Sequence, residues 1–168
     1  MTPSARVALF KTIGGVLEHL PERVDVALAA RVADLLAIVP KIHPGKRLEV
    51  VSSVAPDVAV ACEAQDVDEM LGNLIDNAAK WAAKRIRVSA STEGGEVAVV
   101  IEDDGPGLID DKAPEAMQPD RKLDESTPGY GFGLPITREL AELYGGGLAL
   151  SRSDLGGAKA RLTLPAAR

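Results

Sequence analysis

The sequence predicts an α/β protein: a two-layer α/β sandwich in which a mixed sheet of about five strands carries three helices on one face. Three segments have apolar residues at helical spacing, and short runs rich in Val lie between them. They follow one another in the order helix, strands, helix, hairpin, loop, helix, strands, which indicates helices on one face of a mixed sheet. The chain of 168 residues is long enough for one buried core.

Charge and composition narrow the class of protein. The net charge of −6 argues against a partner that is nucleic acid or an anionic membrane, although one or two local cations could still hold a phosphate. The single cysteine, Cys62, excludes an internal disulfide, and two histidines cannot build a zinc site alone. No apolar run reaches the length of about 20 residues that spans a membrane, and no signal peptide is evident. We therefore expect a cytoplasmic protein, or the cytosolic part of a membrane-bound parent.

The first elements are expected in the N-terminal third. Residues 1–21 have a mixed composition and are either an added leader or the end of a preceding helix, so the folded domain is expected to span 22–168. Apolar residues at helical spacing predict a helix over 21–39, which Pro40 ends.

The remaining elements follow from periodicity and turn residues. Amphipathic helices are expected over 66–84 and 134–144, and three consecutive glycines beginning at Gly145 stop the second one. The polar segment 104–130 is too long for a plain connection and is therefore either disordered or functional. Strands are expected over 47–54, 58–62, 85–92, 96–104, 148–153 and 158–165.

Polar residues form a stripe along the helix predicted over 66–84. The stripe, spaced by four, four and three residues, comprises Glu69, Asn73, Asn77 and Lys80. Such a stripe usually faces water, but Asn is a weak helix former and its carbonyl oxygen is a suitable ligand for Mg²⁺. Lys80 would provide a positive charge that can bind a phosphate. Trp81, beside it, would provide a flat apolar surface on which a base can pack.

Two glycine-containing segments complete the pattern. In IEDDGPGL, 101–108, a strand carries Asp103 into two glycines. This is either a plain strand-to-turn transition or a carboxylate placed to accept a hydrogen bond from an exocyclic amine. In PGYGFGLP, 128–135, glycines at alternate positions precede a helix, an arrangement that can cradle phosphates. This second segment matches neither the dinucleotide fingerprint nor the Walker A loop.

In this order the segments resemble the GHKL ATPase superfamily, and within it the catalytic ATP-binding domain of bacterial sensor histidine kinases, which has a Bergerat-type fold. The similarity covers about residues 24–165 and is strongest toward the PhoQ-like branch. The N box is matched by NLIDNAAKW (73–81), the glycine boxes by DDGPG (103–107) and GYGFGL (129–134), and a trailing glycine box by residues 156–157.

The resemblance implies Mg-ATP as the ligand and assigns roles to individual residues. Asn77 would coordinate Mg²⁺ with Asn73 assisting, and Lys80 would contact a phosphate. Asp103 would bind the adenine amino group, and Trp81 would pack on the nucleotide. Residues 108–128 would form the ATP lid, and the further nucleotide contacts would be Gly105, Gly107, Leu108, Gly129, Tyr130, Gly131, Phe132, Gly133 and Leu134.

The same resemblance implies phosphoryl transfer rather than hydrolysis. Related ATPases activate water with a glutamate at the position of Asn73, and an amide cannot act as a general base. Glu69, one helical turn earlier, is a candidate acid or base, so the candidate catalytic residues are Asn73, Glu69 and Lys80. The implied reaction moves the γ-phosphate to a histidine on a separate dimerisation domain, with a response regulator as an indirect partner.

Two parts of the family pattern are missing. The lid has no recognisable phenylalanine-containing F box, so Arg121 and Lys122 are either γ-phosphate contacts or a solvated basic pair. Neither His19 nor His43 is followed by an acidic residue, as a phosphoacceptor would be. We therefore expect the dimerisation domain to precede residue 1. An anti-sigma-type serine kinase and a non-catalytic docking module of the same fold remain open as alternatives.

Overall fold

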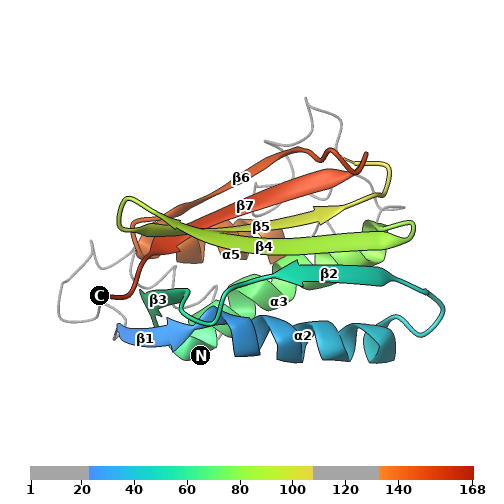
Figure 1. Cartoon of the computed structure of the whole chain (residues 1–168). Helices are drawn as coiled ribbons and strands as arrows, with labels where there is room; N and C mark the ends of the chain where they lie inside the picture. The colour runs from blue at the N-terminus through green and yellow to red at the C-terminus, as the bar shows by residue number, and fades with distance from the viewer. Residues whose placement is uncertain (1–22, 108–132) are drawn as a thin grey trace.

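A computed structural model of the chain describes residues 23–107 and 133–168, and the two segments 1–22 and 108–132 lie outside the described residues. Figure 1 shows a sheet layer with helices on one face. The elements are β1 (Val24–Ala27), α2 (Leu28–Ile42), β2 (Glu49–Ser53), β3 (Ala59–Cys62), α3 (Ala64–Trp81), β4 (Arg85–Glu93), β5 (Glu96–Asp103), α5 (Gly133–Leu143), β6 (Gly147–Arg152) and β7 (Ala158–Pro165).

The larger sheet has five strands in the order β2-β4-β5-β7-β6. β2 runs parallel to β4, and the other neighbours are antiparallel. With helices α2, α3 and α5 on one face, this arrangement confirms the predicted α/β class with a mixed five-stranded sheet. The predicted leader 1–21 and lid 108–128 lie outside the described residues.

The β4–β5 hairpin turns on Gly94 and Gly95, as the sequence predicts. Their φ angles are +59° and +83°, and Glu93 pairs with Glu96 on either side of them. Positive φ at both central residues belongs to the turn type that matches the twist of the two strands, and glycine adopts it without steric cost. The hairpin places β5 at the centre of the sheet, with its end at Asp103.

The helix predicted over 21–39 is wrong at both ends. Residues 24–27 form strand β1, which pairs antiparallel with β3 in a separate two-stranded sheet. This pairing joins residues more than 30 positions apart, and helical periodicity cannot reveal it. At the other end the helix continues through Pro40 to Ile42. Pro40 lies in the last turn, where its missing N–H removes one hydrogen bond near the end of the helix.

Helix α3 carries the apolar stripe that the sequence predicts. Its buried side chains include Val67, Met70, Leu71, Leu74, Ile75 and Ala78. The helix ends at Trp81 rather than at Lys84, because Ala82 takes an extended conformation with ψ 136°. The opposite, polar stripe therefore ends close to the start of β4.

Helix α5 stops where the glycines predict. Gly145 has a φ of +83°, its N–H donates to Glu142 O at 3.0 Å, and the Gly146 N–H donates to Ala141 O at 2.8 Å. These two bonds form a Schellman motif, which satisfies carbonyls that the helix end leaves without partners. Among the helices that the structure describes, none is long and apolar enough to cross a bilayer.

Candidate functional site

A small cavity lies where α3, the end of β5 and the start of α5 meet. Its volume is about 20 Å³, room for about one water molecule. Four of its lining residues are predicted site residues from three separate segments: Asn77, Trp81, Asp103 and Leu134. The rest of the wall is mainly apolar and comprises Leu74, Ala78, Ile101, Leu150, Ala158 and Ala160.

Asn77 places a buried amide oxygen in this wall. Its Oδ1 has no hydrogen-bond partner among the described residues. A buried acceptor in that state costs about 1–3 kcal/mol unless a ligand satisfies it. An amide oxygen is also a hard ligand of the kind that Mg²⁺ accepts together with phosphate oxygens. Asn77 therefore fits the metal-binding role that the resemblance implies.

Asp103 is held at the end of β5 by backbone amides. It is 4% exposed, and its Oδ1 accepts hydrogen bonds from the N–H of Gly105 at 2.9 Å and of Ala158 at 3.3 Å. Burial raises the pKa of Asp103 above its ordinary value, and these two hydrogen bonds offset part of that rise. None of the bonds between this carboxylate and the described residues uses Oδ2.

Glycines let three backbone segments meet at Asp103. A Cβ on Gly157 would collide with Oδ1 and the backbone carbonyl oxygen of Asp103, and a Cβ on Gly105 would collide with the carbonyl of Trp81. Gly107 has a φ of +74° and lies against the backbone of Gly157. Any larger residue at 105 or 157 would therefore push the wall of the cavity away from the carboxylate.

Asn73 ties α3 to the start of α5. Its Nδ2 donates to Gly133 O at 3.3 Å and to Thr137 Oγ1 at 3.2 Å, and Thr137 Oγ1 donates to Gly133 O at 2.8 Å. The amide nitrogen thus serves the packing of the two helices. The structure brings two of the predicted site residues, Asn73 and Gly133, together, but neither residue lines the cavity.

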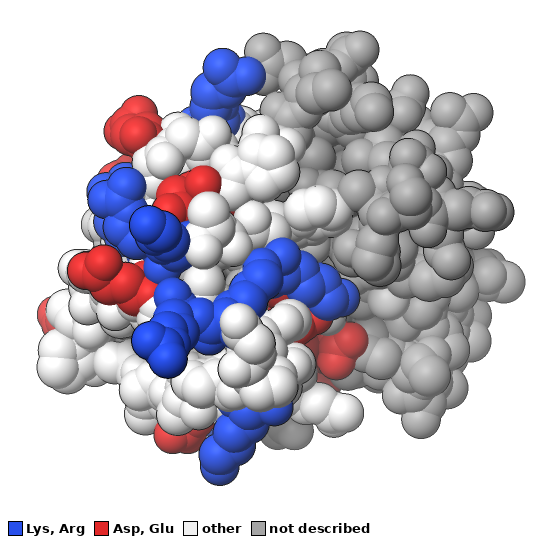
Figure 2. Space-filling model, turned by 90° about the vertical axis from the view of Figure 1, so that its right-hand side faces the viewer, with Lys and Arg blue, Asp and Glu red and all other residues white. Residues whose placement is uncertain are grey.

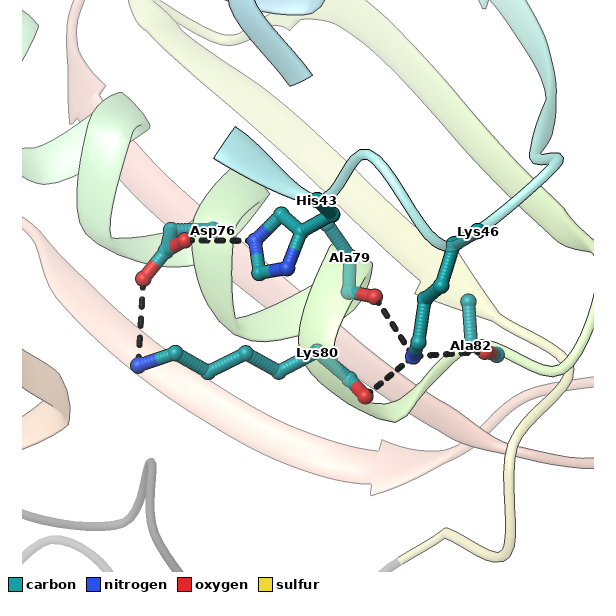
Figure 3. A network of polar contacts seen from close by, with 6 residues as sticks. All are labelled: His43, Lys46, Asp76, Ala79, Lys80 and Ala82. Carbon is teal, nitrogen blue, oxygen red and sulfur yellow. Dashed lines mark hydrogen bonds and ion pairs between the residues drawn. The ribbon is translucent and has the colours of Figure 1, made fainter. Parts of the chain in front are cut away.

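The charged candidates on α3 lie outside the cavity wall. Lys80 is 41% exposed, and its Nζ pairs with Asp76 Oδ2 at 3.2 Å; the other oxygen of Asp76 meets His43 Nε2 at 2.9 Å (Figure 3). Glu69 is half-buried one turn before Asn73. Six predicted contacts lie outside the described residues: Leu108, Arg121, Gly129, Tyr130, Gly131 and Phe132.

The end of the molecule that carries this site is rich in basic side chains. Figure 2 looks at the end where α2, α3 and β5 finish; several Lys and Arg side chains are spread over its described surface, with Asp and Glu between them and uncharged residues over much of the rest. A local excess of positive charge attracts an anionic ligand even though the whole chain carries a net charge of −6.

Four residues that the sequence analysis did not place in the site support it. Gly157 and Thr137 make the close contacts described above, and Lys46 and Asp104 bond the backbone at the end of α3. The Gly-Gly pair at 156–157 was a signal for Gly157. No local pattern marks Lys46, because its partners lie more than 30 residues away.

Comparisons with known proteins identify the family of the chain. A family model described as histidine kinase-, DNA gyrase B-, and HSP90-like ATPase matches residues 62–168. The sensor protein kinase CarS of Pseudomonas aeruginosa is 40% identical over 121 residues, which is 72% of this chain and 27% of that protein. The virulence sensor histidine kinase PhoQ of Salmonella typhimurium is 31% identical over 126 residues, 75% of this chain and 26% of that protein. The chain thus spans about a quarter of the length of these relatives.

Solved structures show the same fold. The mycobacterial sensor histidine kinase MprB has a TM-score of 0.72 at 22% identity, over 85% of this chain and 98% of that chain. The ATP-binding domain of PrrB from Mycobacterium tuberculosis has a TM-score of 0.70 at 24% identity, over 88% and 99%. Full-length ShkA, solved in complex with AMPPNP, has a TM-score of 0.72 at 24% identity, over 88% of this chain and 32% of that chain.

Proposed function

Because the chain belongs to the histidine kinase-, DNA gyrase B-, and HSP90-like ATPase family, and its relatives are sensor histidine kinases, we propose that it binds Mg-ATP and transfers the γ-phosphate to a histidine on a separate dimerisation domain. A response regulator would then be an indirect partner. We further propose that the catalytic unit spans residues 22–168, with 108–128 as its lid, and that it works in the cytoplasm without contacting the membrane itself.

One observation carries the proposal: Asp103, Asn77 and Trp81 line a single cavity. The buried carboxylate of Asp103 would accept a hydrogen bond from the adenine amino group, which guanine lacks at that position. Trp81 would cover the base. The cavity has room for about one water, so its lining side chains would shift to admit the base.

The phosphates would lie beyond Asn77, toward the basic end of the molecule. Asn77 Oδ1, with Asn73 assisting, would hold Mg²⁺, and the metal would supply charge neutralisation for the triphosphate. Lys80 has three N–H donors and uses one on Asp76, so it can also reach a phosphate. The backbone N–H groups of 131, 133 and 134 would receive the remaining phosphate oxygens.

Transfer of the γ-phosphate at this site would depend on the positioning of ATP relative to the acceptor histidine. Asn73 offers an amide where a hydrolytic enzyme needs a base, so water would be activated poorly and ATP would persist until the acceptor histidine arrives. Glu69 would assist proton movement from one turn away. Arg121 would contact the γ-phosphate from the lid.

A nucleotide titration tests the binding step. Trp81, the chain's one tryptophan, should report a saturable change with Mg-ATP and a much weaker one with Mg-GTP. Asp103→Asn should weaken adenosine binding about tenfold or more: the amide oxygen would accept the Gly105 and Ala158 hydrogen bonds, and the NH2 group, a donor, would then face the donating adenine amino group. Calorimetry that detects no heat with Mg-ATP, together with an unchanged Trp81 signal, would favour the docking module instead.

A second experiment tests the acceptor. The chain is incubated with labelled ATP and, in separate reactions, with the dimerisation domain of its parent and with candidate antagonist proteins, and each product is treated with acid. Loss of the label indicates phosphohistidine, whereas an acid-stable label indicates the serine kinase.

A further inference from the structure

We propose that Lys46 is a positioning residue for nucleotide binding: it fixes the end of α3 from which Trp81 enters the base cavity. This inference rests on the proposed function for its ligand, and its own evidence is the backbone geometry around Trp81. Lys46 lies in the connection between α2 and β2, outside every motif of the sequence analysis.

The Lys46 ammonium binds the last turn of α3. Its Nζ donates to Ala79 O at 2.9 Å, to Ala82 O at 3.0 Å and to Lys80 O (Figure 3). A helix leaves its last four carbonyls without intrahelical partners, and a cation there also meets the negative end of the helix dipole. Lysine has three N–H donors, and here all three point at backbone carbonyls.

Asp104 binds the short connection between α3 and β4. Its Oδ1 accepts hydrogen bonds from the N–H groups of Ala83, Lys84 and Arg85, each at 2.9 Å. Burial alone would raise the pKa of Asp104, but the hydrogen bonds from these amides outweigh it and lower the pKa, so the carboxylate is charged at neutral pH. The Lys46 ammonium thus binds carbonyls at the end of α3, and the Asp104 carboxylate binds the amides that lead into β4.

The hydrogen bonds of Lys46 and Asp104 together hold Trp81 in place. Its side chain lines the cavity, and its carbonyl lies so close to Gly105 that no Cβ fits between them. The backbone of the helix end therefore touches the strand end that carries Asp103. A helix end whose backbone is fixed before the ligand arrives avoids the cost of ordering that backbone on binding, whereas a frayed helix end would let the indole leave the cavity.

The test compares Lys46→Met, which keeps the length of the side chain and removes the donors, with Lys46→Arg, which restores donors. Two further variants serve as controls for Lys46→Met. Lys84→Met removes a neighbouring charge, and Arg31→Met removes the 2.6 Å ion pair between Arg31 and Asp68 elsewhere on α3. Each variant is titrated with adenosine and with Mg-ATP, well below its unfolding temperature.

We expect Lys46→Met to weaken adenosine and Mg-ATP by the same factor, about tenfold, because the base wall is common to both ligands. Lys46→Arg should recover most of the affinity, and both controls should bind adenosine, which carries no phosphate, as the unaltered chain does. Acrylamide should quench Trp81 more strongly in Lys46→Met than in either control.

Wild-type adenosine affinity and unchanged quenching in Lys46→Met would overturn the proposal while leaving the proposed function intact. If the unaltered chain binds no nucleotide, the proposed function fails. In that case the quenching comparison still decides whether Lys46 positions Trp81.

Discussion

Asn77 shows at the scale of one residue how the proposed binding role would conflict with stability. Its position on the polar stripe of the helix is readable from the sequence, and the asparagine is unusual enough there to suggest a ligand. The sequence cannot reveal that Oδ1 is buried without a hydrogen bond among the described residues, because this depends on side chains from β5 and α5.

Replacing Asn77 with Leu should therefore stabilise the free protein and abolish Mg-ATP binding. The change removes a buried acceptor of similar size, so we expect the free energy of unfolding to rise by about 1 kcal/mol. Urea unfolding with and without Mg-ATP measures both effects. A fall in stability would mean that Oδ1 has a partner in solution.

The buried carboxylate of Asp103 predicts a pH dependence with a definite sign. Because its pKa is raised in the folded state, protonated Asp103 favours folding, and this contribution is complete below the unfolded pKa of about 3.9 and is lost as pH rises through the folded pKa. Asp103→Asn cannot ionise but can accept the same amide hydrogen bonds. The stability gained by Asp103→Asn should thus be greater at pH 7 than at pH 4, as urea unfolding at the two pH values would show. An equal gain at both would contradict the raised pKa.

At the scale of the element, the sequence predicts features that depend on neighbouring residues and misses features that depend on residues far away in the chain. The amphipathic face of α3, the Gly94-Gly95 hairpin and the glycine stop of α5 depend on neighbouring residues, and all three are confirmed. Strand β1 depends on a partner at residues 59–62, and its four residues were absorbed into a helix. The cation at the end of α3 was missed for the same reason.

Glycines at different places in these elements should respond differently to alanine. Gly157→Ala should destabilise the fold by about 2–3 kcal/mol and weaken adenosine binding, because the new Cβ overlaps Asp103 and the backbone of Gly105. Gly72→Ala is the matched control. Its Cβ would meet only Leu35 at an ordinary 3.9 Å, and alanine in a helix interior should add about 0.5–1 kcal/mol. Thermal unfolding and adenosine titration of both variants test the contrast, and equal effects would rule out the close approach at Asp103.

At the scale of the whole molecule, α3 is the helix that contacts the core, α5, the turn after α2 and the end of β5. Its stripe faces the core, its asparagines face α5 and the cavity, and its end is bonded to the turn after α2 and to the residue after β5. Its start is tied to the end of α5, where Tyr144 Oη donates to Asp66 Oδ2 at 2.5 Å and accepts from the Glu63 N–H at 3.1 Å. Nucleotide binding between α3 and α5 would therefore add to contacts that already join the two helices at their far ends.

This arrangement predicts that the far contact serves stability alone, whereas the near contact serves both the packing of the two helices and binding. Tyr144→Phe should lower the free energy of unfolding by about 1–3 kcal/mol, because it removes a donor from the buried Asp66 carboxylate and an acceptor from the Glu63 amide. Its affinity for Mg-ATP, measured well below the unfolding temperature, should stay within about twofold of the unaltered chain, a difference of ~0.4 kcal/mol. Thr137→Val removes a buried hydroxyl that is bonded to Asn73 and Gly133 at the near end, so it should lower the free energy of unfolding and also weaken Mg-ATP binding by more than twofold. If Tyr144→Phe lost affinity as strongly as Thr137→Val, the two ends of the helix pair would be coupled, and α3 and α5 would move as one body when the nucleotide binds.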